Sequence, residues 1–320
     1  MSITRSALVV GPARCIFTPN SGSAATFFTN DAFEVKLNTK RFEIQPQGFT
    51  QSDQRDEDRT VEFDVTPDGR WNSTIIAALW PYLNSLPGLS MPTNTDKTFI
   101  AHGADGGLLT VIASYLKKMP NVTLSAKKSM IGSAGFKGIV GSDMDPEDAS
   151  SYLTYAASGG TIVDTAFSLA AIKTQPYSAA WGSVAGFESF YAEDGFEISF
   201  DMQSKEIQVD GLGTVNEVLQ KVGVMVKCKP VGPTAAQILT ALRFQGATNS
   251  LGRSHAAGGA ALTITGGLDS VNIFTSPKMS LVEAGYRFGN DVLRNGEVGF
   301  VANMNPASGV QGAIATLAAA

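Results

Sequence analysis

An internal repeat is the feature that most constrains how this chain can fold. Residues 27–79 align without a gap on residues 190–242, at an offset of 163. Fourteen of the 53 aligned positions are identical, whereas ordinary composition gives about one match in fifteen, or roughly three or four. The identities fall in order and include turn residues such as Pro67/Pro230 and Gly69/Gly232. The repeat is domain-sized and too long for a solenoid, so we expect two tandem copies of one unit.

A second block of similarity follows at an offset of 153, where His102 meets His255 and Leu109 meets Leu262. The change of offset predicts ten extra residues in copy one, within a surface loop at residues 83–97. An acidic segment with a proline lies between the copies and is typical of a linker. The expected division is therefore copy one at 1–145, a linker at 146–160 and copy two at 161–320.

Apolar periodicity predicts a mainly β unit with one short helix. In copy one, Phe33, Val35 and Leu37 alternate with polar residues, as in a strand with one buried face. Further strands are expected near 42–45, 61–65, 108–116, 122–124 and 136–140, and their counterparts in copy two near 196–200, 224–228, 261–265, 279–281 and 298–301. Short helices are expected at 72–80 and 234–244, each packing an apolar stripe on the sheet. Each copy is thus predicted to be a β-sandwich or half-barrel of six to eight strands.

One strongly charged segment interrupts copy one at residues 50–60. Copy two has the far less charged residues 213–223 in its place. Two interpretations stay open: a solvated hairpin tip, or an arm that contacts a neighbouring subunit through charge pairs and sets register. The charged residues of this segment are Asp53, Arg55, Asp56, Glu57, Asp58 and Arg59.

The composition argues against several classes of function. The net charge of −5 is poorly suited to gripping phosphates, and no apolar run is long enough for a transmembrane helix. The two cysteines, Cys15 and Cys228, are expected in the core, and the three tryptophans in the core or at a domain interface. No catalytic, phosphate-binding or metal-binding motif is present. We therefore expect no enzyme activity, no catalytic residue, no metal and no cofactor.

The chain resembles the tail tube proteins of long-tailed bacteriophages. The resemblance rests on the strand order, the turn-and-helix segment at residues 66–82, its echo at 229–244, and the charged segment at 50–60. It implies a tube domain built from a β-sandwich or half-barrel, located in the virion tail and assembled in the host cytoplasm. Family members form stacked rings of six tube domains around a channel for double-stranded DNA. Two domains per chain then imply three chains per ring.

The resemblance also suggests which residues face the channel. A channel that lets DNA pass needs polar or acidic walls, because basic residues would hold the phosphates. The candidates are the acidic residues of the outward strand faces, for which an ordinary solvated position is the alternative. These candidates are Glu34, Glu43, Asp64, Glu197 and Glu206.

Two other functions are compatible with the sequence. A baseplate hub or distal-tail protein also uses paired tube-like domains, and it would stop at one ring. A carbohydrate- or receptor-binding β module would need exposed aromatic residues in a pocket on one copy.

Overall fold

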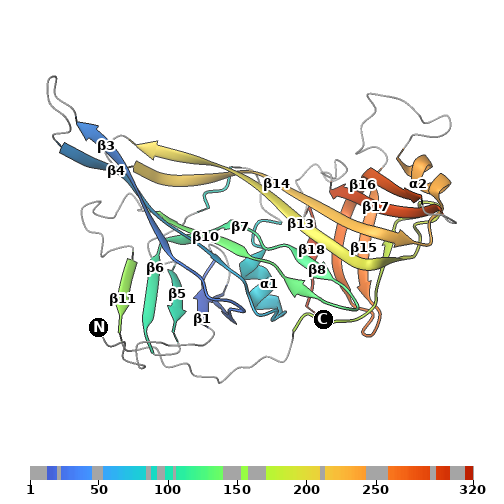
Figure 1. Ribbon diagram of the computed structural model, residues 1–320, viewed down its shortest axis with the longest axis horizontal. Helices are drawn as coiled ribbons and strands as arrows, with labels where there is room; N and C mark the ends of the chain where they lie inside the picture. The colour runs from blue at the N-terminus through green and yellow to red at the C-terminus, as the bar shows by residue number, and fades with distance from the viewer. Residues whose placement is uncertain are drawn as a thin grey trace.

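A computed structural model of the protein describes residues 13–19, 23–44, 53–83, 88–91, 98–103, 106–139, 153–157, 171–209, 213–242, 259–288, 293–302 and 314–319. This part of the chain is mainly β, with several sheets and two short helices. The strands form two bodies side by side along the long axis of the molecule (Figure 1). The first half of the chain builds most of one body, and the second half builds the other.

The first body is a sandwich of two antiparallel sheets. The five-stranded sheet has the order β11-β6-β5-β1-β2, with β1 at Arg14–Phe17, β2 at Ala25–Phe28, β5 at Thr98–His102, β6 at Leu108–Ile112 and β11 at Leu153–Ala156. The four-stranded sheet has the order β3-β4-β10-β7, with β3 at Lys36–Ile44, β4 at Asp53–Val65, β7 at Ser114–Lys118 and β10 at Ala134–Ile139. Strands β6 and β7 are separated only by Ala113, whose φ of 52° redirects the chain from one sheet to the other.

Phenylalanines fill the space between the two sheets. Phe17 of β1 lies edge-on to Phe136 of β10, with ring centroids 4.9 Å apart. Phe99 of β5 likewise lies 4.6 Å from Phe63 of β4. All four rings are buried, so edge-to-face packing adds to the burial of their apolar surface. These contacts hold the sandwich together.

The second body is a sheet that closes on itself. Its order is β12-β15-β16-β17-β14-β13-β8-β9, and β12 also pairs with β13, so six strands form a closed ring. The edge-to-face contacts of Trp181, Phe187, Phe190 and Phe300 fill this ring. The strands are β8 at Val122–Leu124, β9 at Met130–Ile131, β12 at Tyr177–Trp181, β13 at Phe190–Val209, β14 at Gly213–Val231, β15 at Ala260–Gly266, β16 at Asn272–Phe288, β17 at Leu293–Ala302 and β18 at Thr316–Leu317, which pairs with β16.

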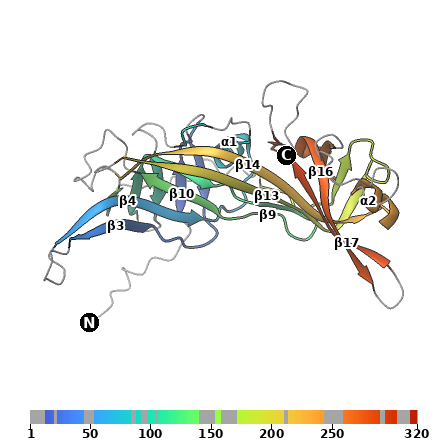
Figure 2. The same ribbon diagram turned by 90° about the horizontal axis from the view of Figure 1, so that it is seen from above.

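Two hairpins tie the bodies together. The β13–β14 hairpin is much longer than the ring needs, and its distal half extends back along the first body (Figures 1 and 2). In the opposite direction, the β8–β9 hairpin of the first half of the chain adds to the edge of β13. The two halves therefore exchange strands across their boundary.

Both predicted helices are confirmed. Helix α1 spans Ser73–Leu79, and Asn72 caps it by accepting a 2.9 Å hydrogen bond from the Ile75 N–H. Helix α2 spans Ala235–Ala241 behind a capping box formed by Thr234 and Gln237. Helix α2 ends three residues earlier than expected, and residues 243 and 244 lie outside the described part.

Several sequence-based expectations about loops are wrong. The charged residues 53–60 are the first part of β4, and the predicted strand at 42–45 is the end of β3. Residues 213–223 likewise belong to β14. Polar residues can enter these strands because the backbone of a two-stranded ribbon is paired whatever its side chains are.

Two strands form outside the segments expected to be strands. Within the predicted linker, β11 pairs with β6 and becomes an edge of the five-stranded sheet. Near the end of the sequence, β18 pairs with β16. Ala318 then accepts a 2.7 Å hydrogen bond from the Trp71 indole N–H. Backbone pairing, which composition does not reveal, decides both cases.

The phenylalanine core generates a stability prediction. Phe136→Ala should lower the free energy of unfolding by about 3–5 kcal/mol, because it opens a cavity among Phe17, Phe63 and Phe99. Leu37→Ala is the control, since Leu37 is 63% exposed and its loss should change stability by less than about 0.5 kcal/mol. Urea unfolding followed by tryptophan fluorescence measures both, and equal effects would contradict this view of the core.

Candidate functional site

A buried ion pair joins the long hairpin to the first body. Lys137 of β10 and Glu217 of β14 have side chains only 2% and 1% exposed, and the Lys137 Nζ lies 3.3 Å from Glu217 Oε2. The hydroxyls of Tyr115 and Ser204 both donate hydrogen bonds to the Glu217 carboxylate. Lys137 also pairs with Glu206 of β13, which is partly exposed. We call Tyr115, Lys137, Ser204, Glu206 and Glu217 the hairpin cluster.

Strand periodicity explains why these groups meet. In the four-stranded sheet, Lys137 pairs with Glu62 on one side and with Tyr115 on the other, so all three share one face. The neighbouring Phe136 points to the opposite face and into the sandwich. The distal β13–β14 hairpin lies over the Lys137 face and brings Ser204, Glu206 and Glu217 with it.

The electrostatics of the hairpin cluster favour the charged pair. Burial by itself would raise the pKa of Glu217, but hydrogen bonds from Ser204 and Tyr115 and the charge of Lys137 bring it below its usual value. Burial by itself would lower the pKa of Lys137, but Glu206 and Glu217 raise it above its usual value. Burial and the Glu217 charge raise the pKa of Tyr115, which keeps the phenol a hydrogen-bond donor.

Two further attachments fix the same hairpin. Asp58 of β4 accepts hydrogen bonds from the Thr214 N–H, at 3.0 Å, and the Thr214 hydroxyl, at 2.9 Å. The backbone of residues 88–91 pairs with β14 beside Glu217, where the Met91 N–H donates to the Glu217 carbonyl at 2.8 Å. The register of the hairpin on the first body is therefore set at three separate points.

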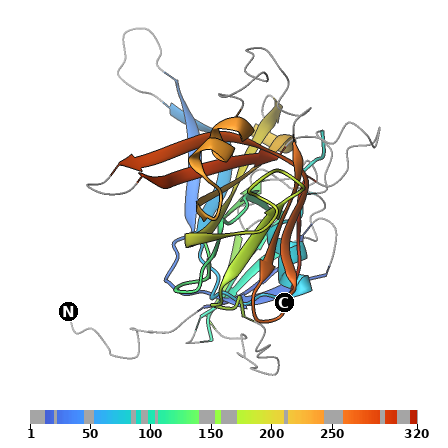
Figure 3. The same ribbon diagram turned by 90° about the vertical axis from the view of Figure 1, so that its right-hand side faces the viewer.

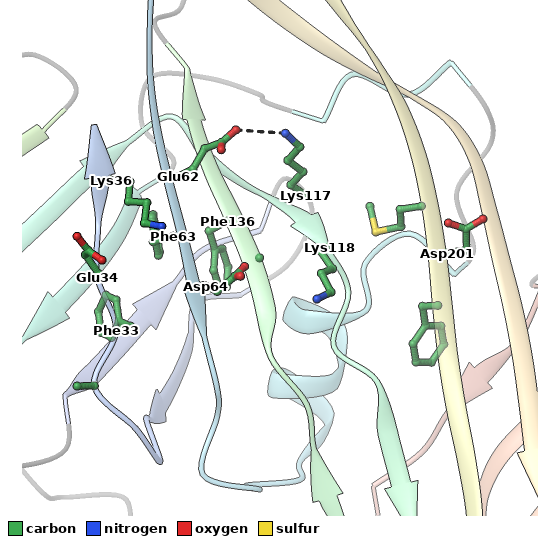
Figure 4. Close-up of a pocket in the computed structure, with 14 residues that line it drawn as sticks. Phe33, Glu34, Lys36, Glu62, Phe63, Asp64, Lys117, Lys118, Phe136 and Asp201 are labelled. Atoms are coloured by element: carbon green, nitrogen blue, oxygen red, sulfur yellow. Dashed lines mark hydrogen bonds and ion pairs between the residues drawn. The ribbon is translucent and has the colours of Figure 1, made fainter. Parts of the chain in front are cut away.

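A groove lies beside the hairpin cluster, between the four-stranded sheet and β13 (Figure 4). Its volume is about 740 Å³, and its wall carries both charges and phenylalanine rings. Glu62 forms an ion pair with Lys117 across this wall, at 3.2 Å. The charged lining residues are Glu34, Lys36, Glu62, Asp64, Lys117, Lys118 and Asp201. Four carboxylates against three lysines leave the groove close to neutral.

The structure places the predicted channel residues in different environments. Glu34 and Asp64 are exposed and line the groove. Glu197 is exposed on the outer face of β13, where it pairs across the strands with Lys227. Glu206 is instead engaged by Lys137 in the hairpin cluster. The side chain of Glu43 lies outside the described part.

The structure describes the predicted contact segment only in part. Side chains of residues 53–57, including Asp53, Arg55, Asp56 and Glu57, are outside the described part, although their backbone pairs with β3. Asp58 contacts Thr214 of the same chain, so one charge of this segment joins the two halves of a single molecule. Arg59 is half-buried in β4.

The other singled-out residues are packed inside. Cys15 and Cys228 are buried, and burial raises the pKa of both thiols, as expected for core residues. The three tryptophans are also buried, as predicted. His102 ends β5, where burial and Arg14 lower its pKa. His255 lies outside the described residues.

Sequence reasoning did not find the hairpin cluster. Lys137 and Glu217 each stand in an apolar strand segment, FKGIV and VNEVL, where a charged residue is a signal of a paired burial. Their partners are far apart in the sequence and on different strands. Only the path of the long hairpin shows that they meet.

Comparisons with known proteins name no relative. No protein-family model matches the chain, and no curated protein matches it. Among the described residues, no helix is long and apolar enough to span a membrane. The described residues also contain no group of three or more potential metal ligands of the His, Cys, Asp or Glu type.

The buried pair predicts an asymmetry between two lysines. Lys137→Met should lower the free energy of unfolding by about 3–5 kcal/mol, because it leaves the Glu217 carboxylate buried without its cation. Lys117→Met is the matched control, since its pair with Glu62 is exposed and is worth at most about 1 kcal/mol. Urea unfolding measures both. A Lys137→Met/Glu217→Met variant should recover part of the loss, and no recovery would argue against the pairing.

The same pair predicts an acid-side loss of stability. The pKa of Glu217 is lower in the folded protein than the ordinary value of about 4.3, so its contribution is present above that value. It is lost as the pH falls through the folded pKa, with a slope of at most about 1.4 kcal/mol per pH unit. Urea unfolding between pH 6 and pH 3 should show a shallower pH dependence for Glu217→Gln than for the wild type. Parallel curves would show that Glu217 does not titrate as described.

Proposed function

We propose that this protein is a tail tube subunit of a long-tailed bacteriophage. Three chains, each with two tube domains, would form one ring, and stacked rings would enclose a channel for double-stranded DNA. The observation that carries the proposal is the agreement between the sequence repeat and the strand pairings of the two halves, because a chain with two equivalent domains is what a pseudo-sixfold ring of three subunits requires.

The first support comes from the central hairpins. In the first body Leu37 pairs with Val61, and in the second Phe200 pairs with Val224. Phe200 lies 163 positions after Leu37, and Val224 lies 163 positions after Val61, which is the offset found in the sequence. The bridge between Thr29 and Pro67 and the pair between Ala192 and Pro230 are related by the same shift.

The remaining pairings extend the equivalence around each body. The order β2-β1-β5-β6 corresponds to β13-β12-β15-β16, and the order β3-β4-β10-β7 corresponds to β13-β14-β17-β16. Strand β16 takes the place of both β6 and β7, and β13 takes the place of both β2 and β3. Four residue pairs of the first body match four of the second, each residue being shifted by 163 to 165 positions. In the order first body and then second body, they are Cys15↔Phe27 and Ala179↔Phe190, Phe99↔Val111 and Leu262↔Ser276, Phe136↔Leu116 and Phe300↔Leu281, and Phe136↔Phe63 and Phe300↔Val226.

This equivalence replaces the second block of the sequence alignment. Strand β5 begins nineteen positions after the last residue of α1, and β15 begins nineteen positions after the last residue of α2. Under this equivalence, copy one has no ten-residue insertion between its helix and the next strand. His102 then corresponds to Thr265 instead of His255.

Surface chemistry also supports a tube domain over the alternatives. The groove is nearly neutral, and Glu34, Asp64 and Glu197 are exposed, so these surfaces would not hold DNA phosphates strongly. All three tryptophans of the chain are buried, and the exposed tyrosines Tyr155 and Tyr191 do not line the groove, so no ring of either kind is placed there to stack on a sugar. A baseplate or distal-tail ring shares the same domain features and differs in whether rings stack.

Electron microscopy of the purified protein tests the proposal. We expect rings of three chains that stack into hollow tubes as the protein concentration rises, with a sedimentation coefficient that rises in parallel. Single rings that never stack would favour the baseplate or distal-tail function. Monomers at all concentrations would contradict the tail tube proposal.

A further inference from the structure

The β8–β9 hairpin shows how a hairpin from one half of the chain can pair with a strand of the other half. Residues of β8 pair with β13 in an antiparallel register, Val122 with Ile198 and Thr123 with Glu197. This hairpin continues the β7–β10 pair of the first body and reaches into the second. At this junction the segment 196–198 of β13 is paired on both sides, with β14 and with β8.

The second body carries an equivalent hairpin tip. Val122↔Ile131 and Thr123↔Met130 at the tip of the first correspond to Arg287↔Arg294 and Phe288↔Leu293 at the tip formed by β16 and β17. We call residues 284–288 with 293–297 the distal tip. The distal tip projects away from the body in two views (Figures 2 and 3). In the described part of the chain the backbone of these two segments pairs only between β16 and β17, while the side chains of Tyr286, Asn295 and Glu297 bond the second body near the base of the tip.

The first body carries an equivalent receiving edge. Residues 33–35 correspond to 196–198 of β13 by the offset of 163. No strand of the described chain pairs with residues 33–35, and β3 begins only at Lys36. Phe33 and Val35 are half-buried against the core, while Glu34 is exposed. We call residues 33–35 the open edge. The open edge thus leads directly into β3, and backbone groups that no strand of the described chain pairs can accept a strand from another chain.

We propose that the distal tip of one molecule adds as a strand to the open edge of a second copy of this chain. The internal junction sets the register: Thr123 opposite Glu197 predicts Phe288 opposite Glu34, and Val122 opposite Ile198 predicts Arg287 opposite Val35. The proposal rests on the duplication described under the proposed function, and it names the contact that would join the subunits.

The local backbone fits this occupant. Gly195, with a φ of +94°, allows β8 to pass close to β13, because a Cβ there would lie 2.3 Å from the Leu124 carbonyl oxygen. Ala32 stands at the corresponding position, so the added strand pairs with Glu34 and Val35 and leaves the edge before residue 32.

The contact is necessarily head-to-tail. The tip belongs to the second body and the open edge to the first, so each molecule offers one of each. A heterologous contact of this kind closes into a ring or continues as a filament. A two-fold dimer made by this contact would need a geometry in which both tips reach both edges at once.

Cysteine cross-linking tests the register. We would mix Glu34→Cys protein with Phe288→Cys protein and add a short bismaleimide. The expected result is a covalent dimer at least tenfold more abundant than in a mixture of Glu34→Cys with Leu268→Cys, whose site is exposed in the β15–β16 turn. The native Cys15 and Cys228 are buried, so they should not react. Chains that carry both Glu34→Cys and Phe288→Cys should form a ladder of products.

A Thr123→Cys/Glu197→Cys chain is the matched control, because it places the same reagent at the internal junction. It should give an internal link without dimers. If this control reacts and the Glu34/Phe288 mixture yields no more dimer than the Leu268 mixture, the proposed contact is wrong. Tubes seen by microscopy without this cross-link would leave the tail tube proposal standing and overturn only the contact. The cross-link without tubes would leave the proposed contact standing and overturn the tail tube proposal.

Discussion

Pairing of strand edges is the constraint on which the structure depends. Every buried backbone N–H and C=O needs a partner, and a strand edge left open is a site for another chain. The second body meets this requirement by closure, since β12 pairs with both β13 and β15. The first body instead has two sheets, and the chain passes from one to the other at Ala113. At residues 33–35, the open edge, no strand of the described chain supplies this pairing.

The long β13–β14 hairpin makes the two halves interdependent. Its distal half would gain little from two strands alone, because an isolated hairpin is marginal in water. The hairpin cluster, the Asp58–Thr214 bonds and the backbone of residues 88–91 fix it on the first body. A buried ion pair of this kind contributes little net stability but penalises other registers, because a shift leaves Lys137 or Glu217 uncompensated. The pair thus fixes how the distal half of the hairpin sits on the first body.

Sequence patterns predicted local structure well where side chains decide it. The apolar stripe and Asn72 predicted α1, and the alternation around Val61 and Val65 predicted a strand with one buried face. The patterns failed where backbone pairing decides. Residues 53–60 are polar enough for a loop, yet they form part of strand β4. The acidic candidates were predicted as one class, but Glu206 is bound by Lys137 while Glu34 and Asp64 line the groove.

The sequence by itself determined a mainly β chain, its two helices, and which cysteines and tryptophans are buried, because these follow from apolar spacing along a single strand or helix. It also showed an alignment offset of 163, and the strand pairs Leu37↔Val61 and Phe200↔Val224 differ by the same number of positions. Only the tertiary structure decided that β8 leaves its own half to join β13, and that Lys137 meets Glu217. Such contacts join residues distant in sequence, and their energies depend on burial and geometry that no local pattern contains.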